Sequence, residues 1–183
     1  MIRGNTRRWR AIPAAAAIAV FMAIGGAATA EEGSVKALAP WEGQGQIFHI
    51  GMAEVLFVGA FHGIMYVQTG EDALDALLML CPGTQEISLD DLTTIANGYC
   101  TFENPSGDRV FAKWYCAGEV GACQGKMTLT GGTGKYEGIT GSGEMTVRTV
   151  LSDMAANVES GSVVRSATGL AVWPKLVYRI PER

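Results

Sequence analysis

Residue types that commonly carry out chemistry are scarce in this sequence. Its 183 residues include two histidines, His49 and His62, and the Gly-x-Ser-x-Gly pattern of a serine nucleophile is missing. Glu54 and His62 share one face of an extended chain, so they could form an acid–base or metal pair. Eight strand residues would separate them by about 26 Å unless Gly59 folds the chain back. Glu54 and His62 are therefore candidate catalytic residues, with exposed, solvated side chains as the alternative.

The first thirty residues have the order typical of an export signal. Four arginines lie between residues 3 and 10, residues 11–23 are apolar, and Ala28-Thr29-Ala30 supplies small residues for cleavage. The alternative is an uncleaved membrane anchor, because the apolar character continues almost to Ala28 and approaches a spanning length. We expect cleavage, export to the periplasm or the extracellular space, and no stable membrane insertion afterwards.

Basic surfaces and phosphate-binding motifs are also missing. Removal of residues 1–30 takes away four arginines and no acid, which lowers the formal net charge from −4 to −8. Such an acidic domain is a poor partner for nucleic acid or for anionic lipid. The spacing Gly132-x-Gly134-x-x-x-Gly138 is one residue too long for a dinucleotide site, and Gly134-Lys135 lacks the Ser or Thr of a phosphate loop. We expect no nucleic-acid partner and no cofactor.

Four cysteines remain after the expected cleavage, at positions 81, 100, 116 and 123. An even number in an exported chain indicates disulfides, and three pairings are possible. The short, glycine-containing loop between Cys116 and Cys123 favours that pair, which leaves Cys81–Cys100 as the second. A zinc site is the alternative, but the sequence has no Cys-x-x-Cys and no histidine near a cysteine pair. We therefore expect no metal.

Short alternating segments predict an all-β fold. A polar lead-in over 31–45 precedes a long apolar run over 47–68, and further strands are expected over 72–80, 93–103, 109–116, 124–130, 144–150 and 162–180. Segment 72–80 also has leucines at helical spacing, so a helix is its alternative. In 109–116, Val110, Ala112, Trp114 and Cys116 share one face. About seven to nine strands without a convincing long helix are typical of a sandwich or a barrel, here assigned to residues 46–183.

Glycines cluster between the strands expected at 124–130 and 144–150. Because glycine tolerates positive φ and a close backbone approach, this segment is predicted to be a turn with a bulge in an antiparallel sheet. Its structural glycines are Gly131, Gly132, Gly134, Gly138 and Gly141.

The run Gly131-Gly132-Thr133-Gly134-Lys135-Tyr136-Glu137-Gly138-Ile139-Thr140-Gly141 resembles the signature of the allene oxide cyclase and dirigent protein superfamily. The tail Pro174-Lys175-Leu176-Val177-Tyr178 is similar to the last strand of the cyclases, so the resemblance covers about the final third of the chain. It looks most like the exported bacterial branch, which has no assigned activity. The resemblance implies an eight-stranded antiparallel barrel with an apolar cavity, often trimeric. Thr140 stands where dirigent proteins usually have Arg, and no upstream carboxylate matches the cyclases' catalytic one.

Together these observations favour an exported barrel that binds a small apolar ligand without converting it. The candidate cavity-lining residues are Tyr66, Trp114, Met127 and Met145. A cyclase-like isomerase and a structural cell-envelope barrel are the alternatives. Segments 55–67 and 74–80 are apolar on both faces, so the outer face needs cover, and we expect a homo-oligomer, either a dimer or a trimer.

Overall fold

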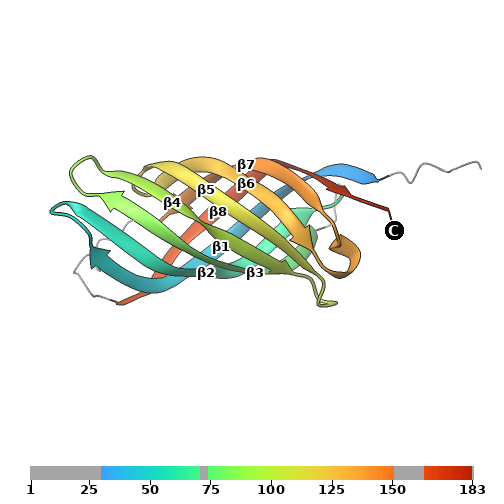
Figure 1. The fold of residues 1–183 in the computed structure, drawn as a ribbon, viewed down its shortest axis with the longest axis horizontal. Helices are drawn as coiled ribbons and strands as arrows, with labels where there is room; N and C mark the ends of the chain where they lie inside the picture. Colours follow the sequence, from blue (N-terminus) through green and yellow to red (C-terminus); the bar gives the residue numbers. More distant parts are fainter. Residues whose placement is uncertain (1–29, 71–73, 151–162, 183) are drawn as a thin grey trace, which may run out of the picture.

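The chain forms a closed, eight-stranded antiparallel barrel, as the sequence predicts (Figure 1). The computed structural model describes residues 30–70, 74–150 and 163–182, and the expected signal peptide therefore lies outside the described residues. Each strand pairs with the next along the chain, and the last pairs with the first. The strands are β1 (Glu31–His49), β2 (Glu54–Gln68), β3 (Leu74–Ser88), β4 (Thr93–Glu103), β5 (Arg109–Glu119), β6 (Ala122–Gly132), β7 (Thr140–Thr149) and β8 (Val163–Ile180), with the short 3₁₀ helix η1 (Gly134–Tyr136) between β6 and β7.

Alternation of side chains sets which face of each strand lines the barrel interior. In β5, Val110, Ala112 and Cys116 are buried, whereas Arg109 and Lys113 on the opposite face are exposed. This confirms the face predicted from the sequence. Closing the sheet also removes its edges, so every strand has a hydrogen-bonded neighbour on both sides.

The first strand begins earlier than the sequence suggested. Residues 31–45 were expected to be a polar lead-in, but they form most of β1 and pair with both β2 and β8. Ala37 and Ala39 point into the core, whereas Lys36, Leu38 and Pro40 are exposed. Because the inward residues are small and an outward one is a leucine, hydrophobicity does not reveal the alternation. The barrel domain therefore starts at residue 31 rather than 46, because β8 needs a partner to close the sheet.

The ambiguous segment 72–80 belongs to strand β3 from Leu74 onward. Pro82-Gly83 does not end this strand, which continues to Ser88 in an unchanged register with β2. On the other side, Leu80 pairs with Thr101 and Gly83 with Gly98, and the ladder is interrupted between those two pairs. Proline lacks a backbone N–H, so an interruption at Pro82 is its expected effect.

A bulge near Pro174 reverses the alternation within β8. In the pairing with β1, Val35 lies opposite Leu176 whereas Ala37 lies opposite Trp173, so β8 carries one extra residue between those pairs. Before the bulge, the odd-numbered Ala171 and Trp173 are buried, and after it the even-numbered Leu176 is buried. An extra residue exchanges the two faces of a strand. Beyond the bulge, the even-numbered side chains of β8 therefore face the interior.

The glycine-rich segment forms the predicted turn and bulge. Gly134 and Gly138 have φ values of 55° and 74°, which favour glycine, and the pairing of β6 with β5 shifts register between Phe111 and Ala112. The connection carries η1, which lies at one end of the barrel beside the described ends of β1 and β8. We call this end the mouth and the opposite one the far end.

The far end of the barrel is filled with apolar side chains. Ile47, Val55, Phe57, Ile87 and Ala167 form one buried cluster there. Next to it Phe61 is the centre of an aromatic group, with ring centroids 5.1 Å from Trp41, 5.6 Å from Phe57 and 5.8 Å from Trp114. Aromatic rings at these separations add favourable edge contacts to their burial.

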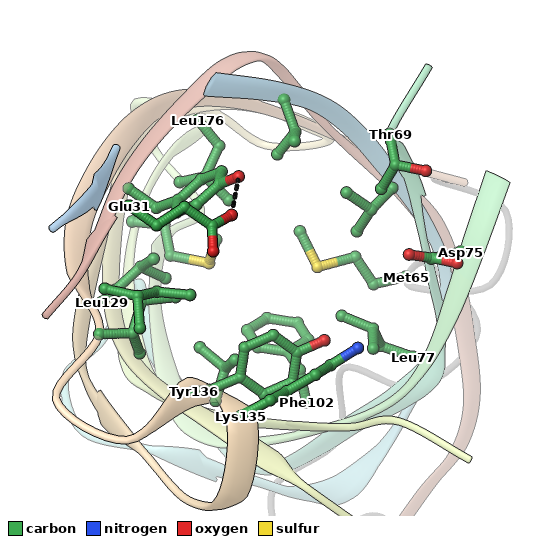
Figure 2. A pocket seen from close by; sticks show the side chains of 17 residues that line it. Glu31, Met65, Thr69, Asp75, Leu77, Phe102, Leu129, Lys135, Tyr136 and Leu176 are labelled. Atoms are coloured by element: carbon green, nitrogen blue, oxygen red, sulfur yellow. Dashed lines mark hydrogen bonds between the residues drawn. The ribbon is translucent and has the colours of Figure 1, made fainter. Parts of the chain in front are cut away.

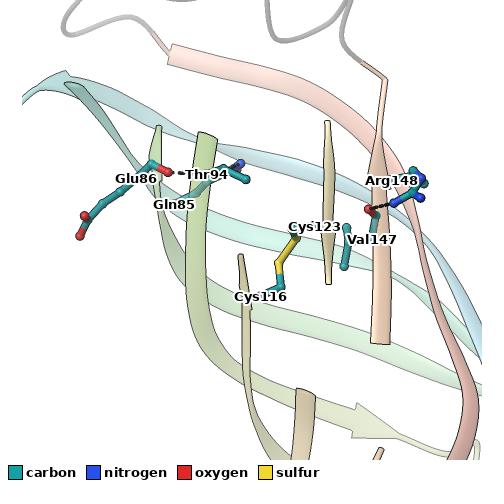
Figure 3. Close-up of a disulfide and its surroundings, with 7 residues drawn as sticks. All are labelled: Gln85, Glu86, Thr94, Cys116, Cys123, Val147 and Arg148. Atoms are coloured by element: carbon teal, nitrogen blue, oxygen red, sulfur yellow. Dashed lines mark hydrogen bonds between the residues drawn. A yellow bond between two sulfur atoms is a disulfide. The ribbon is translucent and has the colours of Figure 1, made fainter. Parts of the chain in front are cut away.

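Both expected disulfides are present inside the barrel. Cys81 of β3 is bonded to Cys100 of β4, with Cα atoms 4.1 Å apart. Cys116 of β5 is bonded to Cys123 of β6, with Cα atoms 5.6 Å apart (Figure 3). All four cysteines are therefore used, which confirms the pairing inferred from the short loop.

The two disulfides should differ in their effect on stability. In a chain-entropy estimate, the Cys81–Cys100 link, with a sequence separation of 19, stabilises by ~3 kcal/mol. The Cys116–Cys123 link, with a separation of 7, contributes ~2 kcal/mol in the same estimate. We expect the paired variant Cys81→Ala/Cys100→Ala to lose more unfolding free energy in urea than Cys116→Ala/Cys123→Ala. Equal losses, or alkylation of any cysteine in the native protein, would contradict this assignment.

Candidate functional site

A cavity of about 280 Å³ occupies the mouth of the barrel. We call it the mouth cavity. Its wall is mostly apolar and includes Met65, Leu77, Phe102, Leu129 and Leu176, whose side chains surround an open centre in Figure 2. Its rim carries the polar groups, namely those of Glu31, Thr69, Asp75, Lys135, Tyr136 and Tyr178.

The rim residues come from distant parts of the sequence. Glu31 begins β1, and Tyr178 lies in β8 beyond the Pro174 bulge, which is why it lines the interior. Lys135 and Tyr136 belong to η1, where the Lys135 Nζ lies 5.0 Å from the centre of the Tyr136 ring. A cation over an aromatic face is attracted to it, so this contact helps to position both side chains.

Tyr178 and Glu31 are hydrogen bonded across the seam between β8 and β1. The Tyr178 hydroxyl donates to Glu31 Oε1 at 3.2 Å. Burial, and next the negative charge of Glu31 and this hydrogen bond, raise the pKa of Tyr178 above its usual value of 10. Tyr178 therefore stays protonated at neutral pH and serves as a hydrogen-bond donor.

A second, smaller cavity of about 70 Å³ lies deeper in the barrel, and we call it the inner cavity. Its wall includes the aromatic rings of Trp41, Phe61, Trp114 and Trp173. All four cysteines also line it, together with Met79, Met127 and Met145. Met127 is fully buried and lines both cavities, so its side chain lies between them.

The structure places three of the four candidate ligand-binding residues at a cavity wall. Trp114, Met127 and Met145 line the inner cavity, and a role in binding remains a prediction for each. Tyr66 lines neither cavity, because β2 directs its odd-numbered neighbours Met65 and Val67 inward. Its expected place in the cavity is therefore corrected to the outer face.

Glu54 and His62 are not brought together by the fold. Both lie on the outward face of β2, and Gly59 continues the regular pairing with β3 instead of folding the strand back. The Glu54 carboxylate accepts a hydrogen bond from the Ala53 amide at 3.3 Å, and His62 Nε2 lies 3.9 Å from Glu42 Oε2. The acid–base pair considered from the sequence is thus not assembled.

Sequence reasoning missed the rim of the mouth cavity. Lys135 and Tyr136 were visible within the glycine-rich turn, but nothing in the turn showed that they overhang a cavity. Glu31 lay in the segment that was expected to be a lead-in. Tyr178 lies beyond the bulge, which exchanges the inward and outward faces of β8. A proline inside an otherwise regular strand was the one available signal, because proline in a sheet favours a bulge or an edge.

The two carboxylates of the mouth cavity, Glu31 and Asp75, are exposed, so they lack the burial that tunes many catalytic acids. Among the residues that the structure describes, no group of three or more His, Cys, Asp or Glu side chains could hold a metal ion. Across residues 30–70, 74–150 and 163–182, no helix has the length and apolar character to cross a membrane.

Comparison with solved structures finds similarity to a pterocarpan synthase dirigent protein. The two chains share 11% identity with a TM-score of 0.38, over 84% of this chain and 88% of the other. No protein-family model matches the chain, and no curated protein matches it. A similarity at this level carries no argument about function, which has to come from the cavities themselves.

The Tyr178–Glu31 pair can be tested by titration. We expect one phenol, assigned by its loss in Tyr178→Phe, to ionise above the usual tyrosine pKa of 10. The raised pKa of Tyr178 contributes to the free energy of unfolding. This contribution is fully present below the usual tyrosine pKa of 10 and is lost as the pH rises through the pKa of the folded protein. Glu31→Gln should lower the Tyr178 pKa without restoring it fully, since burial remains.

Ultraviolet absorbance of the phenolate measures this ionisation. Glu32→Gln is the matched control, because Glu32 is the adjacent carboxylate and pairs instead with Arg179, at 3.4 Å. An equal shift in Glu31→Gln and Glu32→Gln, or no shift in either, would show that the hydrogen bond does not influence Tyr178.

Proposed function

We propose that this protein is an exported barrel that binds a small apolar ligand in its mouth cavity without converting it. The observation that carries the proposal is a cavity of about 280 Å³ with an apolar wall and a polar rim, at one end of a closed barrel. An apolar protein cavity of about 150 Å³ holds benzene. The mouth cavity therefore suits a ligand of roughly two fused or linked rings, or a branched chain of similar volume.

Export is supported by two features that are independent of each other. The basic, apolar and small-residue order of residues 1–30 is typical of a secretory signal. Both pairs of cysteines are bonded in the barrel, and disulfides persist mainly in oxidising compartments outside the cytosol. The proposed location is the periplasm or the extracellular space.

A cyclase-like activity is less well supported than binding. Such a reaction would use a buried carboxylate or an ionisable tyrosine to direct a reactive substrate. Glu31 and Asp75 are exposed, and the pKa of Tyr178 is raised, which opposes formation of a phenolate base. Binding without conversion is thus the function that the geometry supports best.

Filling the mouth cavity should abolish binding of an apolar probe. Leu129 is buried and lines the mouth cavity, so Leu129→Trp should weaken binding of the neutral fluorophore N-phenylnaphthylamine by about tenfold or more, an order of magnitude set by loss of apolar contact. The matched control is Thr128→Trp, one residue earlier on the opposite face of β6. Equal affinity of the native protein and Leu129→Trp would place the probe elsewhere and contradict the proposal.

The natural ligand can be sought directly in protein purified from its own cell envelope. Native mass spectrometry should show a bound small molecule that organic solvent releases. A consistently empty cavity in protein that still binds the fluorophore would leave the binding capacity intact but remove support for a resident ligand.

We also propose that a second copy of the chain covers part of the outer face. Leu78 and Leu80 of β3 are 64% and 53% exposed, although both are leucines within a strand. Ile64 pairs with Leu78 across β2 and β3, and Leu80 connects through Thr101 of β4 to Phe111 of β5. Exposed apolar side chains thus lie close together on β2, β3 and β5, with Thr101 of β4 between Leu80 and Phe111, and clustered exposed apolar residues mark interaction sites.

Sedimentation can test this second proposal. The native protein should sediment as a dimer or trimer, and Leu78→Glu/Leu80→Glu should shift it to the monomer because two charges would be buried at the contact. Thr140→Glu, at an exposed position on β7, should leave the assembly unchanged. A native protein that stays monomeric at high concentration would overturn the proposal.

A further inference from the structure

Two indole N–H groups are buried in the barrel without a hydrogen-bond acceptor. They are Nε1 of Trp114 on β5 and Nε1 of Trp173 on β8, and neither has a partner in the described part of the chain. Trp173 is 3% exposed. Both rings line the inner cavity, whose volume is about 70 Å³.

An unpaired buried donor is costly, because water that bonded to it in the unfolded chain has not been replaced. Most buried donors in native proteins are therefore satisfied, and tryptophan usually places its N–H against an acceptor. Two unsatisfied donors at the wall of one cavity point to an acceptor that enters from outside the chain.

Besides the indoles, the polar side chains that line the inner cavity are Gln85 and Thr149, and neither is hydrogen bonded to Trp114 Nε1 or Trp173 Nε1. Thr94 Oγ1 donates to the Glu86 carbonyl at 2.9 Å, so it must accept the 2.9 Å hydrogen bond from Gln85 Nε2 (Figure 3). This arrangement fixes the Gln85 amide, which also lines the inner cavity. The side-chain amide nitrogen is thus directed to Thr94.

The wall of the inner cavity also limits the charge that the acceptor can carry. None of the described side chains that line the inner cavity is charged, and most are aromatic, aliphatic or sulfur-containing. Burying an anion there without a counter-charge would be far more costly than burying a neutral group. The acceptor should therefore be an uncharged oxygen.

We infer that the ligand of the mouth cavity carries a neutral carbonyl or ether oxygen that reaches the inner cavity and accepts hydrogen bonds from Trp114 and Trp173. This inference rests on the proposed function, since it assigns the chemical class of the same ligand. The apolar body of the ligand fills the mouth cavity, and a slender end of the same molecule passes Met127. An unbranched methionine side chain adapts its shape readily, which suits a residue shared by both cavity walls.

The size of the inner cavity agrees with such a slender end. A water molecule occupies about 30 Å³ in the liquid, so a cavity of about 70 Å³ accepts a group such as a methyl ketone but not a second ring. The ligand class is therefore an aryl or branched-alkyl body joined to a short, oxygen-bearing chain.

A matched pair of probes can test this inference. Benzylacetone carries a methyl ketone on a short chain from a phenyl ring, and butylbenzene has the same carbon skeleton without the oxygen. Displacement of N-phenylnaphthylamine gives the affinity of each probe. Trp114→Phe and Trp173→Phe should each weaken benzylacetone about tenfold more than butylbenzene, since each removes one buried donor while the hydrocarbon reports the change in packing.

Trp41→Phe is the matched control. Trp41 also lines the inner cavity, but its indole nitrogen is not among the buried atoms without a partner. This substitution should change the affinities of the two probes by the same factor. Indole N–H resonances of the native protein supply a measurement that needs no variant to fold: those of Trp114 and Trp173 should shift with benzylacetone and much less with butylbenzene.

The possible outcomes separate this inference from the proposed function. If both probes bind, but the variants weaken them equally and the indole resonances do not distinguish them, the cavity binds apolar molecules and the assigned oxygen is wrong. If the fluorophore binds the native protein but neither probe displaces it, the inference fails and the proposed function stands. If the fluorophore does not bind either, both fail. Selective loss of benzylacetone together with selective indole shifts supports both.

Discussion

The hydrogen-bonded seam between β1 and β8 is the constraint on which the rest of the structure depends. These two strands, 19 and 18 residues long, join the start of the barrel to its end. Once they pair, each side chain is committed to the interior or to the surface, since neighbouring residues of a strand point in opposite directions. The seam also brings Glu31 beside Tyr178, so the rim of the mouth cavity exists only when the sheet is closed.

A closed interior must then be filled by side chains of matching volume, and glycine makes room for the largest of them. A Cβ at Gly98 would lie 3.0 Å from the Trp114 ring, and one at Gly83 would lie 2.8 Å from it. A Cβ at Gly43 would likewise lie 3.0 Å from the Phe61 ring. The contact at Gly83 is closer than real Cβ atoms approach a neighbour, and those at Gly98 and Gly43 are tighter than most, so glycine gives these aromatic rings the room that they occupy.

This pairing of rings and glycines explains where the cavities lie. The aromatic rings gather around the inner cavity and toward the far end, where they leave about 70 Å³. The mouth half is lined mainly by methionine and aliphatic side chains, together with Phe102, Tyr136 and Tyr178, and about 280 Å³ remains open. The larger cavity thus lies in the part of the barrel that the rings of Trp41, Phe61, Trp114 and Trp173 do not reach.

Local patterns in the sequence predicted those parts of the fold that depend on neighbouring residues. Alternation in 109–116, the turn over 131–143 and the short disulfide loop are all of this kind. The rim of the cavity could not be predicted, because it depends on register across strands far apart in sequence. The Pro174 bulge shows why: one additional residue exchanges the two faces of β8, so counting along the strand puts Tyr178 on the wrong side. The prediction that Tyr66 lines the cavity was wrong for a related reason. Both faces of its strand are apolar, so hydrophobicity does not show which face is inside.

The two disulfides have a place in this arrangement beyond linking strands. All four cysteines line the inner cavity, with one disulfide joining β3 to β4 and the other joining β5 to β6. Half of the strands of the barrel are therefore held in covalent pairs around the space where the two indole donors lie. Binding is stronger when the receptor does not have to be ordered by the ligand, because the entropic cost of ordering is removed beforehand. In the proposed binding mode, covalent links at the inner cavity, rather than at the exposed mouth, would hold in place the part of the wall that meets the hydrogen-bond acceptor of the ligand.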